Sequence, residues 1–178
     1  MMKLKNIEII NNGLKPFKIP PGLVLIQDTR EQQPLFASPQ DGLEVVTGAL
    51  VHGDYSLKGF EQKFVIERKK ISDFYSYIGK ERERTVKKMK EFREIVLSRG
   101  FVGLVIESPE SDLLTGYIMS RVSPEAARQA LVSFEIRYGV HVYYSRSRKD
   151  IARWVLDRAI KFYRIQREAG TIDETKAA

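Results

Sequence analysis

Three charged residues follow directly on a short apolar stretch in the first half of the sequence. Residues 64–66 are Phe, Val and Ile, a run that is typical of a buried strand, and Glu67, Arg68 and Lys69 come next. Because side chains alternate across a strand, Glu67 and Lys69 should project from one face and Arg68 from the other. Charges at the end of a buried strand are costly unless they are paired or bind a metal. The pattern therefore predicts a site in which a carboxylate lies beside an ammonium group.

A second carboxylate, Asp54, comes just after Gly53, at the close of the apolar run 45–51. If that run pairs with the strand at 64–66 as a hairpin that turns around Gly59, Asp54 approaches the acidic residue of the first motif. Two carboxylates beside a lysine form a site for a hard cation with a positive group next to it. This combination is suited to the hydrolysis of a phosphodiester.

Two further acids, Asp28 and Glu31, close another strand candidate, residues 23–26. Three neighbouring strands could thus bring acids to one edge of a sheet, although Asp28 taken alone is more typical of a turn or a cap. The run 101–107 is apolar on both faces, which indicates a central strand. Glu107 ends it, and a cap or an ion pair is a better interpretation of this residue than a place in the site.

Composition excludes several classes of protein. The chain has 178 residues, of which 43% are hydrophobic, enough for one good core in a single domain. The sequence contains no cysteine, which excludes disulfides, thiolate zinc sites and cysteine nucleophiles, and it has two histidines, too few for a histidine-rich metal site. No apolar stretch approaches the roughly 20 residues that span a bilayer, and a signal-peptide pattern is missing. We therefore expect no membrane association and a soluble, cytoplasmic protein, associated with the nucleoid if it is bacterial.

The helix predicted at 80–98 has a strongly basic face. Between Lys80 and Arg93 there are seven Lys or Arg and three Glu, and the whole chain has a formal charge of +7. Such a balance favours an anionic partner, most often nucleic acid. The candidate DNA-binding residues are Arg82, Arg84, Lys87 and Lys88. The alternative is a solvated face in which the glutamates pair with their neighbours.

The rest of the chain predicts alternating helices and strands. The expected elements are an N-terminal arm or edge strand at 1–22, a loop at 32–43, a short helix capped by Ser72-Asp73, a short irregular or helical connection at 108–122, a strand at 140–144, helices at 123–138 and 147–168, and a flexible tail at 169–178. In the helix at 80–98 we expect Val86, Met89, Phe92 and Val96 to form the buried stripe. The last helix is apolar on more than one face, which fits either deep packing or a partner interface. The order of elements predicts a mixed α/β layer, a sheet flanked by helices.

Several of these motifs together resemble a known family. Gly53-Asp54, Glu67-Arg68-Lys69 and Asp73 resemble the signature of the XPF family of structure-specific endonucleases, Gly-Asp-x(n)-Glu-Arg-Lys-x(3)-Asp. Upstream, residues 28–31 resemble the Asp-x-Arg-Glu element of that family, and 103–107 resemble its following strand. The resemblance covers roughly residues 23–165, and it implies a nuclease domain at 23–168 with a restriction-endonuclease-like fold and a PD-(D/E)XK type of metal site.

The resemblance also implies roles for individual residues. Asp28, Asp54 and Glu67 would hold a divalent cation, Mg²⁺ or Mn²⁺, through oxygen ligands. Glu31 would support the site or serve a second ion. Lys69 would position or polarise the attacking water and stabilise charge on the phosphate.

Supporting roles come from the same resemblance. Arg30 and Arg68 would orient the carboxylates or touch phosphate, and Asp73 would secure the following helix, with purely structural roles equally open for all three. The family usually shows a Gly-Arg segment after this aspartate, and residues 79–84 are an approximate version of it.

The expected function is a metal-dependent DNA endonuclease that acts on branched, flap or junction DNA. One alternative is a non-catalytic nucleic-acid-binding subunit on the same fold, and another is a related PD-(D/E)XK nuclease such as a resolvase, a restriction enzyme or an exonuclease. No tandem helix-hairpin-helix segment fits after residue 168, so we expect a compact bacterial or phage-type member. Its possible partners besides DNA are a second copy of the chain or a targeting protein.

Overall fold

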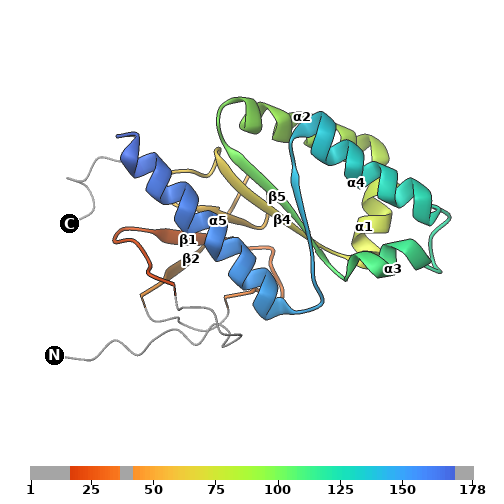
Figure 1. The fold of residues 1–178 in the computed structure, drawn as a ribbon, viewed down its shortest axis with the longest axis horizontal. Helices are drawn as coiled ribbons and strands as arrows, with labels where there is room; N and C mark the ends of the chain where they lie inside the picture. The colour runs from red at the N-terminus through yellow and green to blue at the C-terminus, as the bar shows by residue number, and fades with distance from the viewer. Residues whose placement is uncertain (1–16, 37–41, 171–178) are drawn as a thin grey trace.

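The computed structural model describes residues 17–36 and 42–170, and the strands in these ranges form one mixed sheet (Figure 1). From edge to edge the strands are β2 (Glu44–Gly48), β1 (Val24–Asp28), β3 (Tyr55–Leu57), β4 (Phe64–Lys70), β5 (Phe101–Glu107) and β6 (His141–Tyr144). β3 runs antiparallel to both of its neighbours, whereas β1 and β2 are parallel to each other and β4, β5 and β6 are parallel to one another. The mixed sheet that the sequence predicts is confirmed.

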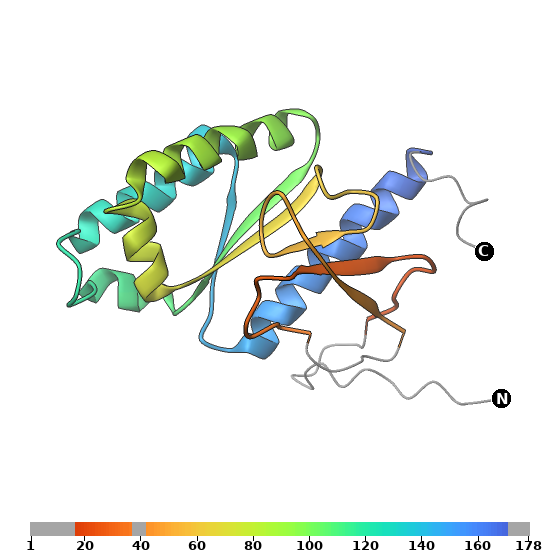
Figure 2. The same ribbon diagram turned by 180° about the vertical axis from the view of Figure 1, so that it is seen from behind.

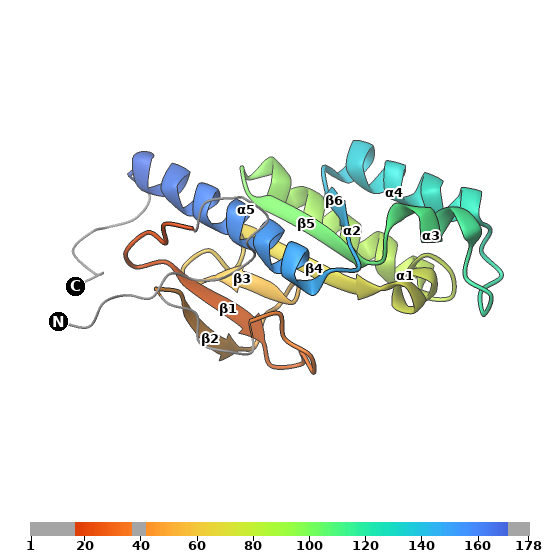
Figure 3. The ribbon, with the colours of Figure 1, turned by 60° about the horizontal axis from the view of Figure 1, so that its bottom comes forward.

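Helices cover the two faces of this sheet unequally. The long helix α5 (Arg148–Glu168) lies on one face, and α1 (Ile71–Ile78), α2 (Arg82–Leu97) and α4 (Pro124–Tyr138) lie on the other, together with the short α3 (Glu110–Thr115). Figure 3 shows this separation across the sheet, and Figure 2 shows the molecule from behind. The sheet therefore separates two hydrophobic cores.

The strand β4 contributes to both cores by simple alternation. Ile66 packs with the core under α5, whereas Val65 packs with the core under α1, α2 and α4. The same alternation continues into the charged end of the strand. Glu67 and Lys69 therefore lie on the same face as Val65, and Arg68 lies on the same face as Ile66. The alternation of strand residues thus places the predicted acid and amine on the side of α1 and α2.

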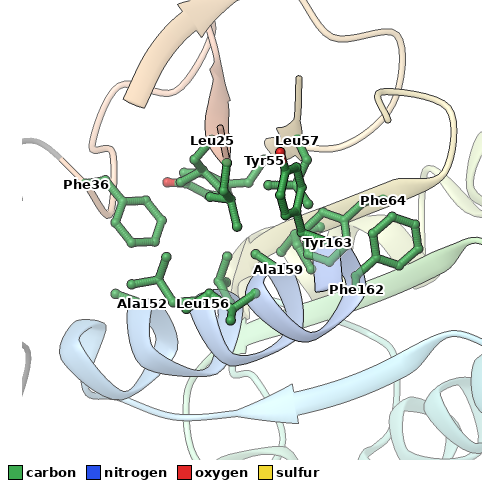
Figure 4. Packing of buried hydrophobic residues seen from close by; sticks show 14 of the residues in the cluster. Leu25, Phe36, Tyr55, Leu57, Phe64, Ala152, Leu156, Ala159, Phe162 and Tyr163 are labelled. Atoms are coloured by element: carbon green, nitrogen blue, oxygen red, sulfur yellow. The ribbon is translucent and has the colours of Figure 1, made fainter. Parts of the chain in front are cut away.

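The helix α5 packs deep within the domain, which decides between the two interpretations of its apolar surface. Leu156, Ala159 and Phe162 face the strands, and Leu25 and Tyr55 lie opposite them in the cluster drawn in Figure 4. Full burial of a large apolar side chain contributes about 1.5–3 kcal/mol, so this helix is a main support of the sheet.

The hairpin predicted around Gly59 exists, but its first strand was predicted wrongly. The partner of β4 across that turn is the short β3, and Tyr55 lies opposite Ile66. The run 45–51 instead supplies β2, which pairs in parallel with β1 at the edge of the sheet. The three residues of β3 are too few to show an alternating pattern. The longer apolar run 45–51 was therefore predicted as the first strand of the hairpin in its place.

Helix boundaries were predicted with mixed success. Ser123 and Ser147 cap α4 and α5 as expected, accepting hydrogen bonds from the N–H groups of Ala126 and Asp150. The Ser72-Asp73 cap was wrong, because α1 already begins at Ile71.

The buried stripe of α2 is rotated from the prediction. Met89 and Phe92 are buried as expected, but Thr85 and Ile95 complete the buried face. The predicted Val86 and Val96 are only half-buried.

Parts of the predicted terminal segments lie outside the described residues, namely 1–16 of the arm and 171–178 of the tail; so do residues 37–41 of the loop. Residues 17–22 contain no strand and lie against α5, where Arg164 donates to the Lys18 carbonyl and the Arg153 guanidinium lies over the Phe17 ring. Within 17–36 and 42–170, no helix has both the length and the apolar composition that crossing a bilayer requires.

Gly53 fixes the approach of the chain to β4. Its φ of +74° lies in the left-handed region, and a Cβ built at this position would lie 2.7 Å from both the Ile66 carbonyl oxygen and Val65 Cγ1. Only glycine meets both constraints without moving the backbone of β4. The next residue, Asp54, is therefore held against the charged end of that strand.

We predict that Gly53→Ala destabilises the protein by about 3 kcal/mol, through left-handed backbone strain and the clash with β4 together. Gly59 is the matched control, because its φ is +84° but nothing lies within 4 Å of an added Cβ. Gly59→Ala should cost about 1 kcal/mol from backbone strain alone. Urea unfolding followed by circular dichroism measures both variants, and equal losses of stability would contradict a packing role for Gly53.

Candidate active site

Asp54 links β1 to β4 at the entrance to β3. Its carbonyl accepts a hydrogen bond of 2.9 Å from the Asp28 N–H, and its own N–H donates to the Ile66 carbonyl over 2.7 Å. One side-chain oxygen, Oδ2, accepts from the Arg68 N–H over 2.6 Å. The main chain and the side chain of Asp54 together fix the carboxylate at the charged end of β4.

Glu67 is buried and carries two amines on its carboxylate. Lys69 Nζ lies 2.6 Å from Oε1, and Lys88 Nζ, from α2, lies 2.8 Å from each of the two oxygens. Burial alone would raise the pKa of Glu67, but the positive charges of Lys69 and Lys88 outweigh it and hold this pKa below the usual range. The predicted common face of Glu67 and Lys69 is confirmed, and the carboxylate is ionised at neutral pH.

Asp54 and Glu67 repel each other electrostatically. Burial and the negative charge of Glu67 raise the pKa of Asp54 to about 6, against the opposing effect of Lys69. Adjacent carboxylates whose charges are incompletely balanced are the hard oxygen donors that Mg²⁺ and Mn²⁺ prefer. The chemistry of this donor pair therefore fits the divalent cation that the sequence suggests.

Lys69 is protonated in this site, so it can contribute a positive charge but cannot accept a proton. Burial alone would lower the pKa of Lys69, but Glu67 and Asp54 raise it above its ordinary value. The ring of Tyr77, on α1, lies under this amine, with Nζ 5.4 Å from the ring centroid. Lys69 is therefore an ammonium group at neutral pH, held between two acids and an aromatic face.

Asp28 lies close to the pair in the sheet but is fully engaged by other groups. Oδ1 accepts from the N–H and Nε of Arg30, and Oδ2 accepts from Arg30 Nη2 and the Leu50 N–H. The hydrogen bonds from Arg30 lower the pKa of Asp28 to about 2, against the effect of burial. Among residues 17–36 and 42–170, no three His, Cys, Asp or Glu side chains are grouped closely enough to hold a metal ion. The three-acid ligand set thus stays a prediction.

Arg68 organises the opposite face of β4. Its guanidinium lies 2.9 Å from Glu31 and 2.9 Å from Glu107, and it donates to the Gln33 carbonyl. Glu31 also accepts a hydrogen bond of 2.8 Å from the Tyr55 hydroxyl. Glu31 is therefore paired with Arg68 rather than with the lysines on Glu67, although its charge helps to raise the pKa of Asp54. The ion-pair interpretation of Glu107 is confirmed.

An open hollow of about 600 Å³ lies over Glu67 between α1 and α2. Of the predicted DNA-binding residues, Arg84, Lys87 and Lys88 line it, as does Asp73 from the first turn of α1. Arg82 lines a different groove, between α2 and α4. A ligand that enters along the basic side of α2 would therefore reach Lys69, with the buried Glu67 directly behind it.

Among the lining residues of this hollow that the sequence interpretation did not assign to the site are Tyr77 and His52. Tyr77 lies one turn after Asp73 on α1, and this spacing of four residues could have placed it on the same face. His52 lines the hollow from the other side, with Nδ1 3.8 Å from Glu91 of α2, and nothing in its local sequence points there.

Comparisons with known proteins identify the family of the chain and support its fold. The ERCC4 domain, as a sequence family, matches residues 27–157. Two solved structures are similar: XPF from Aeropyrum pernix, at 20% identity and a TM-score of 0.58 over 76% of this chain and 59% of that one, and XPF from Aeropyrum pernix in complex with DNA, at 20% identity and a TM-score of 0.58 over 79% and 64%. The chain thus spans about three fifths of the length of these structures. No curated protein sequence matches it.

The raised pKa of Asp54 predicts a specific pH dependence of stability. The protonated form is favoured on folding, so its contribution is complete below about pH 4 and is lost as the pH rises through about 6. Asp54→Asn mimics the protonated acid and keeps an acceptor for the Arg68 N–H. We expect this variant to match the natural protein at pH 4 and to exceed it by about 2 kcal/mol at pH 8, after a discount for partial exposure.

Urea unfolding in the presence of a chelator measures this difference across the pH range. Glu67→Gln is the comparison with the opposite sign, because the lowered pKa of Glu67 means that its ionised form stabilises the fold at neutral pH. A stability difference between Asp54→Asn and the natural protein that does not change with pH would contradict the predicted shift.

Proposed function

Because the chain belongs to the ERCC4 domain family and has the fold of an XPF nuclease domain, we propose that it is a metal-dependent DNA endonuclease. The observation that carries the proposal is the pair of acids formed by the half-buried Asp54 and the buried Glu67, with Lys69 beside them. Glu67 and Lys69 line the open hollow beside the basic side of α2. Branched, flap or junction DNA is the proposed substrate, on the resemblance of the motifs to those of structure-specific endonucleases.

Asp54 and Glu67 are the proposed ligands of a Mg²⁺ or Mn²⁺ ion. When bound there, the ion would supply a Lewis acid for a phosphate oxygen and lower the pKa of a water. Asp28 is the proposed third ligand, and it becomes available only when Arg30 releases it. The side chain of Arg30 is 70% exposed, so this guanidinium can move into solvent or onto a phosphate.

Lys69 is proposed to act on the phosphate and the attacking water without removing a proton. As an ammonium group it donates hydrogen bonds and stabilises negative charge as it develops on the phosphoryl oxygens. Its place is set by the Glu67 carboxylate and the Tyr77 ring, so little reorganisation is needed during the reaction.

The residues on the other face of β4 are proposed to support the site. Arg68 ties β4 to the 31–34 segment through Glu31 and Gln33, which steadies the chain that follows Asp28. On the face of the hollow, Asp73 adds a negative charge near Lys69 that raises the pKa of this amine further. We therefore assign Glu31, Arg68 and Asp73 positioning roles rather than contact with the substrate.

A non-catalytic DNA-binding subunit is the second candidate, and one observation favours it. Both oxygens of Glu67 already carry ammonium groups, so the charge of this one carboxylate is balanced without an ion. In such a subunit the hollow would bind phosphate and the carboxylates would serve the fold alone.

We predict that the purified protein cleaves flap or branched DNA when Mg²⁺ or Mn²⁺ is present and not when a chelator replaces the ion. Glu67→Gln and Lys69→Met should each lower the cleavage rate about 100-fold or more, because each removes a charge at the reacting phosphate. Gel analysis of a fluorescent oligonucleotide substrate measures the rate.

Lys70→Met is the matched control for Lys69→Met. Lys70 is the next residue of β4, but it is exposed and lines a separate pocket beside Arg68 rather than the hollow over Glu67. This control should cleave within a few-fold of the natural protein. Absence of cleavage on every substrate with either ion, together with tight DNA binding, would favour the non-catalytic subunit.

The basic side of α2 predicts how DNA affinity depends on salt. Arg84→Gln and Lys87→Gln should each weaken binding and reduce the slope of log K against log salt by about 1, because each removes one phosphate contact. Arg82→Gln is the control from the same helix, and the slope should stay unchanged since Arg82 faces the groove toward α4. Fluorescence anisotropy at several salt concentrations measures the slopes; equal effects at all three positions would contradict the proposed path.

A further inference from the structure

Lys88 occupies a particular place on the Glu67 carboxylate. Its Nζ is 2.8 Å from Oε1 and 2.8 Å from Oε2, so the ammonium lies equally far from both oxygens. Lys69, in contrast, is paired with Oε1. An equidistant cation faces the open side of the carboxylate, where an ion that uses either or both oxygens would also bind.

Lys88 and a divalent cation therefore compete for the same oxygens. A magnesium ion binds carboxylate oxygens at about 2.0–2.1 Å, so it would lie against an ammonium nitrogen that stays on the same side. Two positive groups cannot share that volume, because both steric overlap and like charge oppose it. Lys69 approaches one oxygen from its own strand and is not subject to this conflict to the same degree.

The ammonium group of Lys88 also has an alternative position, in the hollow. Its side chain is 30% exposed and lines the hollow together with Arg84 and Lys87. The rings of Phe92 and Tyr77 lie 5.7 and 5.9 Å from its Nζ and form an aromatic wall beside the amine. A lysine stem of four methylenes can turn from Glu67 toward an anion in the hollow without any movement of α2.

We propose that Lys88 is an internal counter-ion of Glu67 that must leave before the ion binds, and that a phosphate of the DNA receives it. Ion and DNA then bind cooperatively, since each favours the same position of Lys88. By linkage, the factor by which DNA strengthens ion binding equals the factor by which the ion strengthens DNA binding. Without a phosphate, Lys88 keeps the site closed to ions. This inference rests on the proposed metal site at Asp54 and Glu67.

Calorimetric titration of Mn²⁺ into the protein without DNA tests the first half of the proposal. Lys88→Met should bind Mn²⁺ about tenfold more tightly than the natural protein, because the competing ammonium is gone. Lys87→Met is the matched control, since it removes the same charge from the adjacent position of α2, which lines the same hollow. It should change the affinity by about twofold, the general effect of a nearby charge.

The second half concerns the coupling between ion and DNA. In a Lys69→Met background, in which we expect cleavage to be at least about 100-fold slower, Mn²⁺ should raise the affinity for a labelled flap duplex about tenfold. When Lys88→Met is added, Mn²⁺ should no longer raise the DNA affinity beyond the effect that it has by screening charge. Anisotropy titrations with and without Mn²⁺ measure both values.

The outcomes separate this inference from the proposed function. If Glu67→Gln abolishes Mn²⁺ binding while Lys88→Met binds no more tightly than the natural protein, the counter-ion role is wrong and the metal site stands. If neither the natural protein nor Lys88→Met binds Mn²⁺ in a way that depends on Glu67, the proposed metal site itself is wrong. Should Lys88→Met fail to fold, Lys88→Gln keeps a hydrogen-bond donor to Glu67 without its charge and tests the same competition.

Discussion

The buried carboxylate of Glu67 is the constraint on which the arrangement of the site depends. A negative charge inside a protein is tolerated only when positive groups surround it. Here those groups come from two elements, Lys69 on the same strand and Lys88 on α2, so the pairing of Glu67 also links α2 to the end of β4. The hollow between α1 and α2 lies over this ion pair. The interaction that balances one charge thus also shapes the entrance to the site.

A second charge, on Asp54, makes the arrangement less stable than the fold alone requires. Three hydrogen bonds through its main chain and side chain hold Asp54 beside Glu67, and burial together with repulsion from Glu67 raises the pKa of Asp54. A sequence selected for stability alone would place an amide there. Retaining an acid where it destabilises the folded state at neutral pH is the pattern expected of a binding or catalytic group.

The alternation of β4 and two of the three predicted helix caps could be predicted from the sequence. The shared face of Glu67 and Lys69 needed only the period of a strand, and the starts of α4 and α5 needed only a serine at the cap. The short β3 could not be predicted, because three residues show no period, and the run 45–51 was assigned to its place. In α2 the sequence also could not show which lysine contacts Glu67, because Lys87 and Lys88 are adjacent. No pattern distinguishes Lys88, which reaches Glu67, from Lys87, and the orientation is decided by the packing of Met89 and Phe92 against distant strands.

The two faces of β4 have different roles, because its side chains alternate between them. One face supports the end of the strand, and the other carries the proposed reacting groups. On the side of α5, Arg68 is 6% exposed and joins Glu31, Glu107 and the Gln33 carbonyl into one network, to which Arg148 of α5 adds a further contact with Gln33. These charges neutralise one another and connect elements that are distant in the chain, so they hold the strand end in place. On the other side, the charges are only partly neutralised by fixed partners and border an open hollow. The ion pairs of Arg68 on one face hold the end of β4 in place. The opposite face can therefore keep acids whose charges are incompletely balanced and which an incoming cation can use.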